Sequence, residues 1–170
     1  MRPKWTALPL PRVENMHMHL PMTEHRTAAG VMAAECLCFR ARRVSRALTR
    51  VYDDALRPLG VQATQLTLLN AVSLCGDRAT MARLAGILAM DATTLSRNLR
   101  PLERAGWVRI ARLPSDGRVR LASLTGAGER VVADALPLWR AAHARVVEAL
   151  GADAAAELRD RFDATTSAAW

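Results

Sequence analysis

The chain has 170 residues, enough for one domain with a sizeable core or for a compact domain with an added dimerisation element. Its 24 lysines and arginines outnumber its 16 carboxylates, and the resulting formal net charge of +8 points to phosphates or another acidic partner. Every one of these cations except Lys4 is an arginine, which suits phosphate and guanine contacts but also interhelical ion pairs. No apolar run approaches the roughly 20 residues that span a bilayer, and no continuous signal-peptide core is present. We therefore expect a cytoplasmic protein with no membrane partner.

Residues 1–32 are predicted to form an N-terminal arm, because their beginning is rich in proline and histidine and lacks helical or strand periodicity. The histidines of this arm lack the rigid frame and the further ligands that a metal site needs, so neither a metal nor a cofactor is expected. Cys36, Cys38 and Cys75 have no metal-finger or disulfide-framework spacing, and we expect free thiols.

A long amphipathic helix is predicted from about Ala33 to Leu59. Its apolar residues recur at steps of four and three: Leu37, Ala41, Val44, Leu48, Val51 and Ala55. The other side carries arginines, which we interpret as a solvated face, and Pro58 with Gly60 ends the segment. The apolar stripe needs a partner to bury it.

Three shorter helices are predicted next. Thr64 is a candidate N-cap for a core helix that ends at Gly76 and buries Leu66, Leu69 and Val72 or Ala71. Thr80 can cap residues 81–89, and Asp91 can cap residues 92–106. Only a few residues separate these last two helices, which is the spacing of a helix-turn-helix.

The second helix of this pair carries a face that suits a major groove. Leu95, Leu99 and Leu102 share one side, and short polar or cationic residues occupy the rest: Thr93, Thr94, Ser96, Arg97, Asn98 and Arg100. A solvated helix without a function is the alternative, because such patterns are common. Pro101 removes one backbone donor, so either the helix bends there or it ends earlier than predicted.

A basic-tipped hairpin is predicted after this helix. Val108 and Ile110, and then Val119 and Leu121, alternate with polar residues on either side of a turn at residues 114–117. Such a hairpin directly after a helix-turn-helix is typical of a winged helix, in which one helix reads a major groove and the wing reaches the adjacent minor groove. The expected fold class is mainly α with a small β-hairpin: a winged helix-turn-helix flanked by N- and C-terminal helices.

Two helices are predicted to complete the chain. The first runs from Thr125 to Gly151, with a kink at Pro137 and a buried stripe of Val132, Leu136, Trp139, Ala142, Val146 and Leu150. The last begins at about Asp153 and carries Leu158 and Phe162. Apolar stripes on both sides of the winged helix need burial, and a second copy of the chain is the economical partner.

From about Ala33 to the C-terminus the chain resembles the MarR (multiple antibiotic resistance regulator) family. The resemblance rests on LGVQATQLTLL before the motif, LAGILAMDATTLSRNLRPLERAGWV through it and RLPSDGRVRLASLTGAGE through the wing. It implies a homodimeric repressor that binds a pseudo-palindromic operator in double-stranded DNA and is released by a small-molecule effector. Within a domain of residues 33–170, dimerisation helices would fall at 33–59 and 125–170, and the winged helix-turn-helix at 60–124.

The family's Asp-x-Arg wing element falls on Asp116 and Arg118, where the carboxylate would orient an arginine that enters the minor groove. A pair that only stiffens the turn is the alternative, and both roles can coexist. Arg112 and Arg120 are candidates for contacts to backbone phosphate.

CLCF near the start of the first long helix resembles the peroxide-sensing branch of the family, whose reactive cysteine falls on Cys38. Tyr52 occupies one of that branch's tyrosine positions, whereas the other two positions hold Arg42 and Ala63. A cysteine that only packs as a small hydrophobe is the alternative. Redox sensing through Cys38 is therefore the alternative to a small-molecule effector.

An enzyme is not expected, because no nucleophile-elbow, phosphate-loop or metal-helix motif is present. His143 lies outside the arm, but the sequence offers it no evident acid or nucleophile partner. We interpret it as a packing residue or an effector-pocket residue.

Overall fold

The computed structural model describes residues 24–113 and 116–168; residues 1–23 of the predicted arm lie outside this range. The chain forms two units, residues 1–45 and 46–170. The first unit contains α1 (Glu24–Glu35) and the start of α2 (Leu37–Leu56), which continues into the second unit.

The sequence predicted one helix from about Ala33, but two helices meet at Cys36, and α1 begins within the segment predicted as an arm. No residue of α1 is buried, so its sequence has no regularly spaced core residues from which the helix could be predicted. Its alanines instead favour a helix through their intrinsic propensity. At the start of α2, the backbone N–H of Phe39 donates to Sγ of Cys36 at 3.4 Å.

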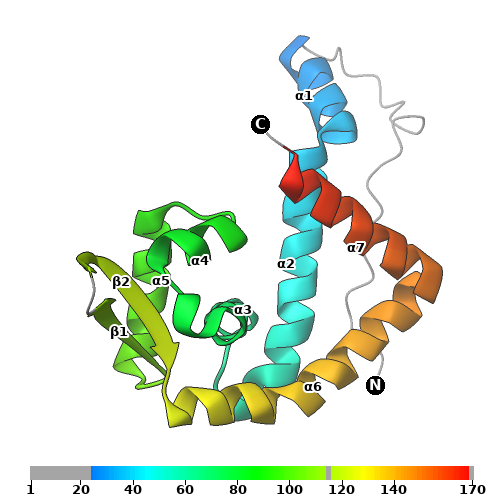
Figure 1. Cartoon of the computed structure of the whole chain (residues 1–170). Helices are drawn as coiled ribbons and strands as arrows, with labels where there is room; N and C mark the ends of the chain where they lie inside the picture. The colour runs from blue at the N-terminus through cyan, green and yellow to red at the C-terminus, as the bar shows by residue number, and fades with distance from the viewer. Residues whose placement is uncertain (1–23, 114–115, 169–170) are drawn as a thin grey trace. The chain divides into compact units, whose positions relative to one another are not determined.

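The second unit is mainly α with a two-stranded hairpin, as predicted (Figure 1). After α2 the elements follow in the order η2 (Arg57–Leu59), α3 (Ala63–Cys75), η3 (Gly76–Arg78), α4 (Met81–Ile87), α5 (Ala92–Arg104), β1 (Val108–Leu113), β2 (Asp116–Leu124), α6 (Gly126–Leu150) and α7 (Ala152–Ser167). The short helices α4 and α5 form the predicted helix-turn-helix pair, and the hairpin follows α5 directly.

Two predicted N-caps, Thr80 and Asp91, are confirmed, and Thr125, at which a long helix was predicted to begin, is also an N-cap. Thr80, Asp91 and Thr125 precede α4, α5 and α6, and each side chain accepts a hydrogen bond from the backbone N–H three residues later, at 3.1, 2.8 and 3.1 Å. Each bond satisfies a backbone donor that has no partner within its own helix.

The predicted N-cap of α3 at Thr64 is wrong, because α3 begins one residue earlier, after Gln62. The side chain of Gln65 accepts from the backbone N–H of Gln62 at 2.9 Å. The carboxylate of Asp53, on α2, accepts from the N–H of Ala63 at 2.6 Å. A residue ten positions earlier in the chain therefore helps to fix the start of α3, which a local cap signal does not reveal.

The hairpin is antiparallel, and its register pairs Val108 with Leu124, Ile110 with Ala122, and Arg112 with Arg120. The register shifts after Arg112, near the turn. The N–H of Ala122 donates to the carbonyl of Ala79 at 3.0 Å, just before α4. Strand β2 of the wing is thus hydrogen-bonded to the segment that leads into α4.

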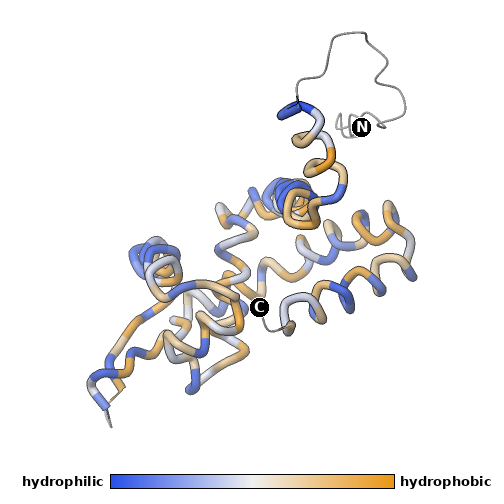
Figure 2. Tube along the Cα trace, turned by 90° about the horizontal axis from the view of Figure 1, so that it is seen from above, coloured by the Kyte–Doolittle hydropathy of each residue, from blue (hydrophilic) through white to orange (hydrophobic). Residues whose placement is uncertain are grey.

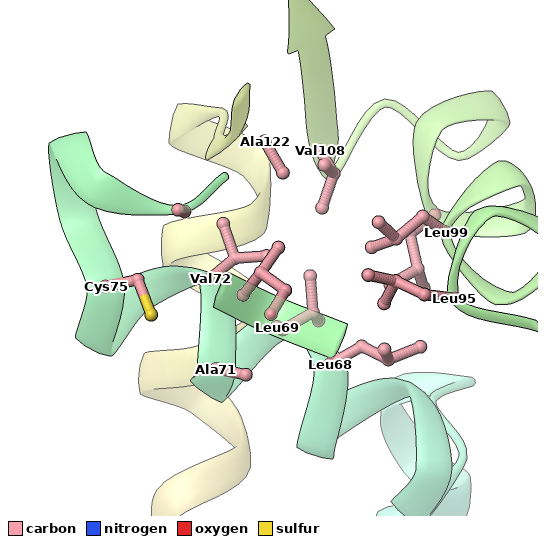
Figure 3. Close-up of a cluster of buried hydrophobic side chains, with 12 residues drawn as sticks. Leu68, Leu69, Ala71, Val72, Cys75, Leu95, Leu99, Val108 and Ala122 are labelled. Atoms are coloured by element: carbon pink, nitrogen blue, oxygen red, sulfur yellow. The ribbon is translucent and has the colours of Figure 1, made fainter. Parts of the chain in front are cut away.

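The winged helix is built on one cluster of buried side chains (Figure 3). The predicted core residues Leu95, Leu99 and Leu102 of α5 are completely buried. In Figure 3 the labelled side chains of α5 point toward those of α3 and toward Val108 and Ala122 of the wing. Each buried leucine contributes about 1.5–3 kcal/mol to folding. This burial fixes which side of α5 faces outward.

A second cluster joins α2, α3 and α6, and its buried members are Leu56, Val61, Leu66 and Ala135. Trp107 packs against this cluster and also against the first, as Val131 and Val132 do. These three residues connect the core of the winged helix with that of the long helices.

The predicted apolar stripe of α6 is only partly buried within one chain. Ala142 is buried, but Leu136, Trp139 and Leu150 are 44%, 37% and 46% exposed. On the stripe predicted for α2, Leu37 is likewise exposed, at 80%. The periodicity predicts an apolar face, and nothing in the chain's described residues covers these parts of it. α6 continues through Pro137 to Leu150.

No helix among residues 24–113 and 116–168 is long and apolar enough to cross a membrane.

Candidate nucleic-acid interface

The outward face of α5 is the centre of the candidate site. Because the leucines of α5 point into the core, Thr93, Arg97 and Arg100 face outward at helical spacing. Together with Ala92 and the half-buried Ser96, they line one open hollow on the surface. Neither Arg97 nor Arg100 forms an ion pair with any described residue. Their guanidinium groups therefore remain available to an anion or a base edge.

The first turn of α5 is held by Asp91. Its carboxylate accepts from the backbone N–H of Thr94 at 2.8 Å and from the hydroxyl of Thr94 at 2.6 Å. The bond from the Thr94 side chain, followed by that from its backbone, lowers the pKa of Asp91. Thr94, a predicted contact residue, thus uses its hydroxyl proton to fix the start of the helix.

Asn98 lies on the flank of α5, exposed, with its side-chain nitrogen 3.8 Å from Sδ of Met90. Of the two alternatives raised by Pro101, the earlier end is found: α5 continues through Pro101 but ends at Arg104, before the predicted residue 106. Arg104 is exposed one turn beyond Arg100 and is a further candidate contact residue that was not predicted. The four-residue spacing of Arg100 and Arg104 was the signal that could have identified it.

The wing extends the basic surface beyond the core. Arg112 and Arg120 are both exposed and lie directly opposite each other on the two strands. Like charges in this position destabilise a hairpin, and a bound anion would relieve their repulsion. Figure 2 shows hydrophilic residues gathered toward the turn.

Asp116 and Arg118 are joined through the backbone. Oδ1 of Asp116 accepts from the backbone N–H of Arg118 at 3.0 Å, and the described residues show no ion pair between the two side chains. An aspartate that bonds to a backbone amide two residues later forms an Asx-turn. Asp116 thus orders the backbone that carries Arg118, while the guanidinium stays exposed.

The winged helix carries a net positive charge. Residues 60–124 contain nine arginines and only four carboxylates. The structure brings the predicted residues of α5 together on one helix surface and those of the wing onto one hairpin of the same unit. A surface with this excess of arginine is suited to the phosphates of a nucleic acid.

The candidate redox residues lie in different units, Cys38 in the first and Tyr52 in the second. Cys36 and Cys38 are exposed and Cys75 is buried, and all three are free thiols, as expected. The hydroxyl of Tyr52 lies 3.1 Å from Nδ1 of His143, and the ring of Trp139 stacks on that imidazole at 4.7 Å between centroids. This partner of His143 could not be predicted from the sequence, because 91 residues separate His143 from Tyr52.

Known proteins that resemble this chain in sequence and in structure are transcriptional regulators of the MarR family. The sequence model described as MarR family matches residues 59–119. A crystal structure of the transcriptional regulator MosR from M. tuberculosis in complex with DNA is 36% identical, with a TM-score of 0.70, and the match covers 78% of this chain and 94% of that chain. A variant of MarR from E. coli complexed with operator DNA is 26% identical, with a TM-score of 0.69 and coverages of 79% and 96%.

CouR from Rhodococcus jostii, crystallised with p-coumaroyl-CoA, shares the fold at 23% identity, with a TM-score of 0.65 and coverages of 81% and 96%. No curated protein matches the chain.

The helix-turn-helix, the hydrogen-bonded hairpin and the outward basic face of α5 define a winged-helix protein. The 36% identity to MosR, over 94% of that chain, assigns the protein to a family within this class. The chain belongs to the MarR family of DNA-binding transcriptional regulators.

Proposed function

We propose that this protein is a repressor that binds a pseudo-palindromic operator as a homodimer and leaves it when a small-molecule effector binds. The observation that carries the proposal is the outward face of α5, where Arg97 and Arg100 flank one open hollow without a carboxylate partner among the described residues. No enzymatic step is part of the proposal.

In the proposed complex, α5 enters a major groove and the wing reaches the adjacent minor groove. Arg97 and Arg100 read base edges, and Thr93, Thr94, Ser96 and Asn98 supply short polar contacts around them. Arg118 enters the minor groove, and Arg112 and Arg120 bind phosphates. The DNA complexes of MosR and of the MarR variant support DNA binding by a protein of this family.

The homodimer is supported by apolar side chains that the chain leaves exposed. On α6 and α7 these are Leu136, Trp139, Leu150, Leu158 and Phe162. A monomer rarely exposes so many large apolar groups, and a second copy would bury them. We assign residues 33–59 and 125–170 to dimerisation, residues 60–124 to DNA recognition and residues 1–32 to an arm.

A repressor needs a signal that releases it. CouR holds p-coumaroyl-CoA in a protein of the same fold, which supports a small-molecule effector here. A screen of candidate compounds for loss of operator binding would identify it. The effector must bind the DNA-free form more tightly than the DNA-bound form, because a ligand with equal affinity for both shifts nothing.

Thiol oxidation is the second candidate for that signal. It is favoured by the exposure of Cys38 and Cys36, and by the position of the Cys36 sulfur, which accepts the N–H of Phe39 at the start of α2. Exposed thiols are the ones that a peroxide in solution can reach. Peroxide treatment followed by mass measurement and an operator-binding assay would separate this signal from a bound effector: only oxidation adds mass to Cys38 or joins two cysteines.

The DNA-binding proposal is tested by footprinting on a genomic operator, together with light scattering at micromolar concentration. The two recognition helices, one on each copy, are related by a twofold axis and must face successive major grooves. We therefore expect half-sites about one helical turn apart. A monomer in solution, or a footprint without twofold symmetry, contradicts the proposal.

A further inference from the structure

The C-terminal end of α5 is fixed by its own backbone. The N–H of Trp107 donates to the carbonyl of Leu102 at 2.9 Å, and that of Gly106 donates to the carbonyl of Glu103 at 3.0 Å. Gly106 has φ of +73°, the left-handed conformation that closes such a helix end and that glycine adopts without strain. The direction in which the chain leaves the recognition helix is therefore set at Gly106 and Trp107.

The beginning of α6 holds these same two residues. The backbone N–H of Thr125 donates to the carbonyl of Trp107 at 3.0 Å. The hydroxyl of Thr125 donates to the carbonyl of Gly106 at 2.6 Å, and its oxygen also accepts from the N–H of Gly128 at 3.1 Å. One threonine thus caps α6 and binds it to the end of α5.

Gly128 allows this close approach. A Cβ atom at this position would overlap the carbonyl oxygen of Trp107 and would lie 3.0 Å from its carbonyl carbon. Both atoms belong to backbone, which cannot turn aside as a long side chain can. Any larger residue at position 128 must therefore move α6 away from Trp107.

The side chain of Trp107 adds a third connection, because it packs against both hydrophobic clusters of the second unit. The recognition helix and α6 thus meet through backbone hydrogen bonds, a close contact at glycine and a shared indole. Elements joined in this way move together as one rigid unit rather than independently.

We propose that Thr125 and Gly128 are positioning residues for DNA recognition: by holding α6 against Gly106 and Trp107, they set the direction of α5 relative to α6. The inference rests on the proposed function, in which α6 forms part of the dimer and α5 enters the DNA. The angle between these two helices then determines the distance between the two recognition helices of the dimer, and so the half-site separation that the dimer accepts.

The test compares Gly128→Ala with Gly126→Ala, a matched control in the same helical turn. An added Cβ at Gly126 meets only the flexible guanidinium of Arg130, at 3.7 Å. Full-length proteins are titrated with three DNA duplexes: the footprinted operator, and versions with the half-sites one base pair closer and one base pair further apart. Circular dichroism and light scattering confirm that each variant is folded and dimeric.

We expect Gly126→Ala to match the wild-type preference among the three duplexes. Gly128→Ala should bind the natural spacing about tenfold more weakly, an effect comparable to one mismatched base pair, and should lose its preference or move it to another spacing. A folded, dimeric Gly128→Ala with the wild-type profile overturns the proposal. An equal loss on all three duplexes also overturns it, because it would indicate a structural role alone.

Thr125→Val and Thr125→Ser provide a second test that adds no atom to the contact at Gly128. Valine keeps the shape of threonine but loses both hydroxyl hydrogen bonds, whereas serine keeps them. We expect valine to alter the spacing preference and serine to retain it; identical profiles for the two overturn the proposal. If the wild type itself binds no inverted repeat, the proposed function fails instead.

Discussion

The hydroxyl of Tyr52 lies 3.1 Å from Nδ1 of His143, and this hydrogen bond joins α2 to α6. Burial raises the pKa of Tyr52 above its ordinary value of 10.0, so the phenol stays protonated at neutral pH and can donate. Trp139 stacks on the same imidazole with only 9° between the ring planes. These three residues fasten the end of α2 to the middle of α6.

Tyr52→Phe should lower the free energy of unfolding by about 0.5–1.5 kcal/mol, because it removes the hydroxyl that bonds to His143 and keeps the aromatic ring. Urea unfolding measures the change. In a His143→Leu background the same substitution should have little further effect, since the partner of the hydroxyl is already absent. Equal losses in both backgrounds would show that the two residues are not coupled.

The Asp91 cap predicts a specific dependence of stability on pH. Hydrogen bonds from Thr94 lower the pKa of Asp91 in the folded protein below its ordinary value of 3.8. Its charge therefore stabilises the fold above the unfolded-state pKa, and this contribution is lost as the pH falls through the folded-state pKa. Asp91→Asn can still accept hydrogen bonds but does not titrate.

The stability of the wild type relative to Asp91→Asn should thus decline as the pH falls below about 5 and through the lowered pKa of Asp91, as followed by urea unfolding at each pH. Other carboxylates titrate in the same range, but they do so in both proteins and cancel in the difference. A difference that stays constant with pH would contradict the assigned role of the charge.

The local features of this fold could be predicted from the sequence. Thr80 and Asp91 were recognisable as caps because capping acts over three residues. Leu95, Leu99 and Leu102 were recognisable as core residues because helical spacing puts them on one face. The Asp-Gly turn between alternating strands similarly predicted the hairpin.

Features that depend on tertiary contacts could not be predicted. Nothing near Tyr52 in the sequence identifies His143, and nothing near Gly128 shows that its neighbour is the carbonyl of Trp107. Nor could the sequence show that Trp139, on the apolar face of α6, stays partly exposed within one chain. Hydrophobic periodicity shows that a face needs burial, but it does not show whether the same chain or a second copy provides it.

For the recognition helix, Arg97→Ala should weaken specific operator binding by about 1–3 kcal/mol if its guanidinium reads a guanine edge. Titration of the operator, and of operators with single base substitutions, measures the loss of affinity and of sequence preference. Arg159→Ala is a matched control, since it removes an exposed arginine of α7. Unchanged affinity and preference for Arg97→Ala would assign the reading of bases to its polar neighbours.

At the tip of the wing, Arg118→Ala should lower operator affinity and reduce the salt dependence of binding by roughly one counterion, with little change in melting temperature. Asp116→Ala should have a weaker effect in the same direction, because Asp116 orders the backbone of Arg118 through its amide. Asp116→Asn keeps an acceptor for this amide and should bind nearly normally. Normal binding with a lowered melting temperature in both alanine variants would mean that the pair only stiffens the turn.

The cross-strand pair Arg112 and Arg120 allows effects on stability and on binding to be separated by their sign. Like charges directly opposite each other destabilise a hairpin, so Arg112→Ala should leave the free energy of unfolding unchanged or raise it by about 0.2–1 kcal/mol. If the pair holds a phosphate, the same variant should bind the operator more weakly and lose roughly one counterion of salt dependence. Arg109 controls for the relief of repulsion, because it lies opposite Ser123, and Arg109→Ala should show no gain in stability. A loss of stability in Arg112→Ala, combined with normal binding at every salt concentration, would remove this pair from the DNA interface.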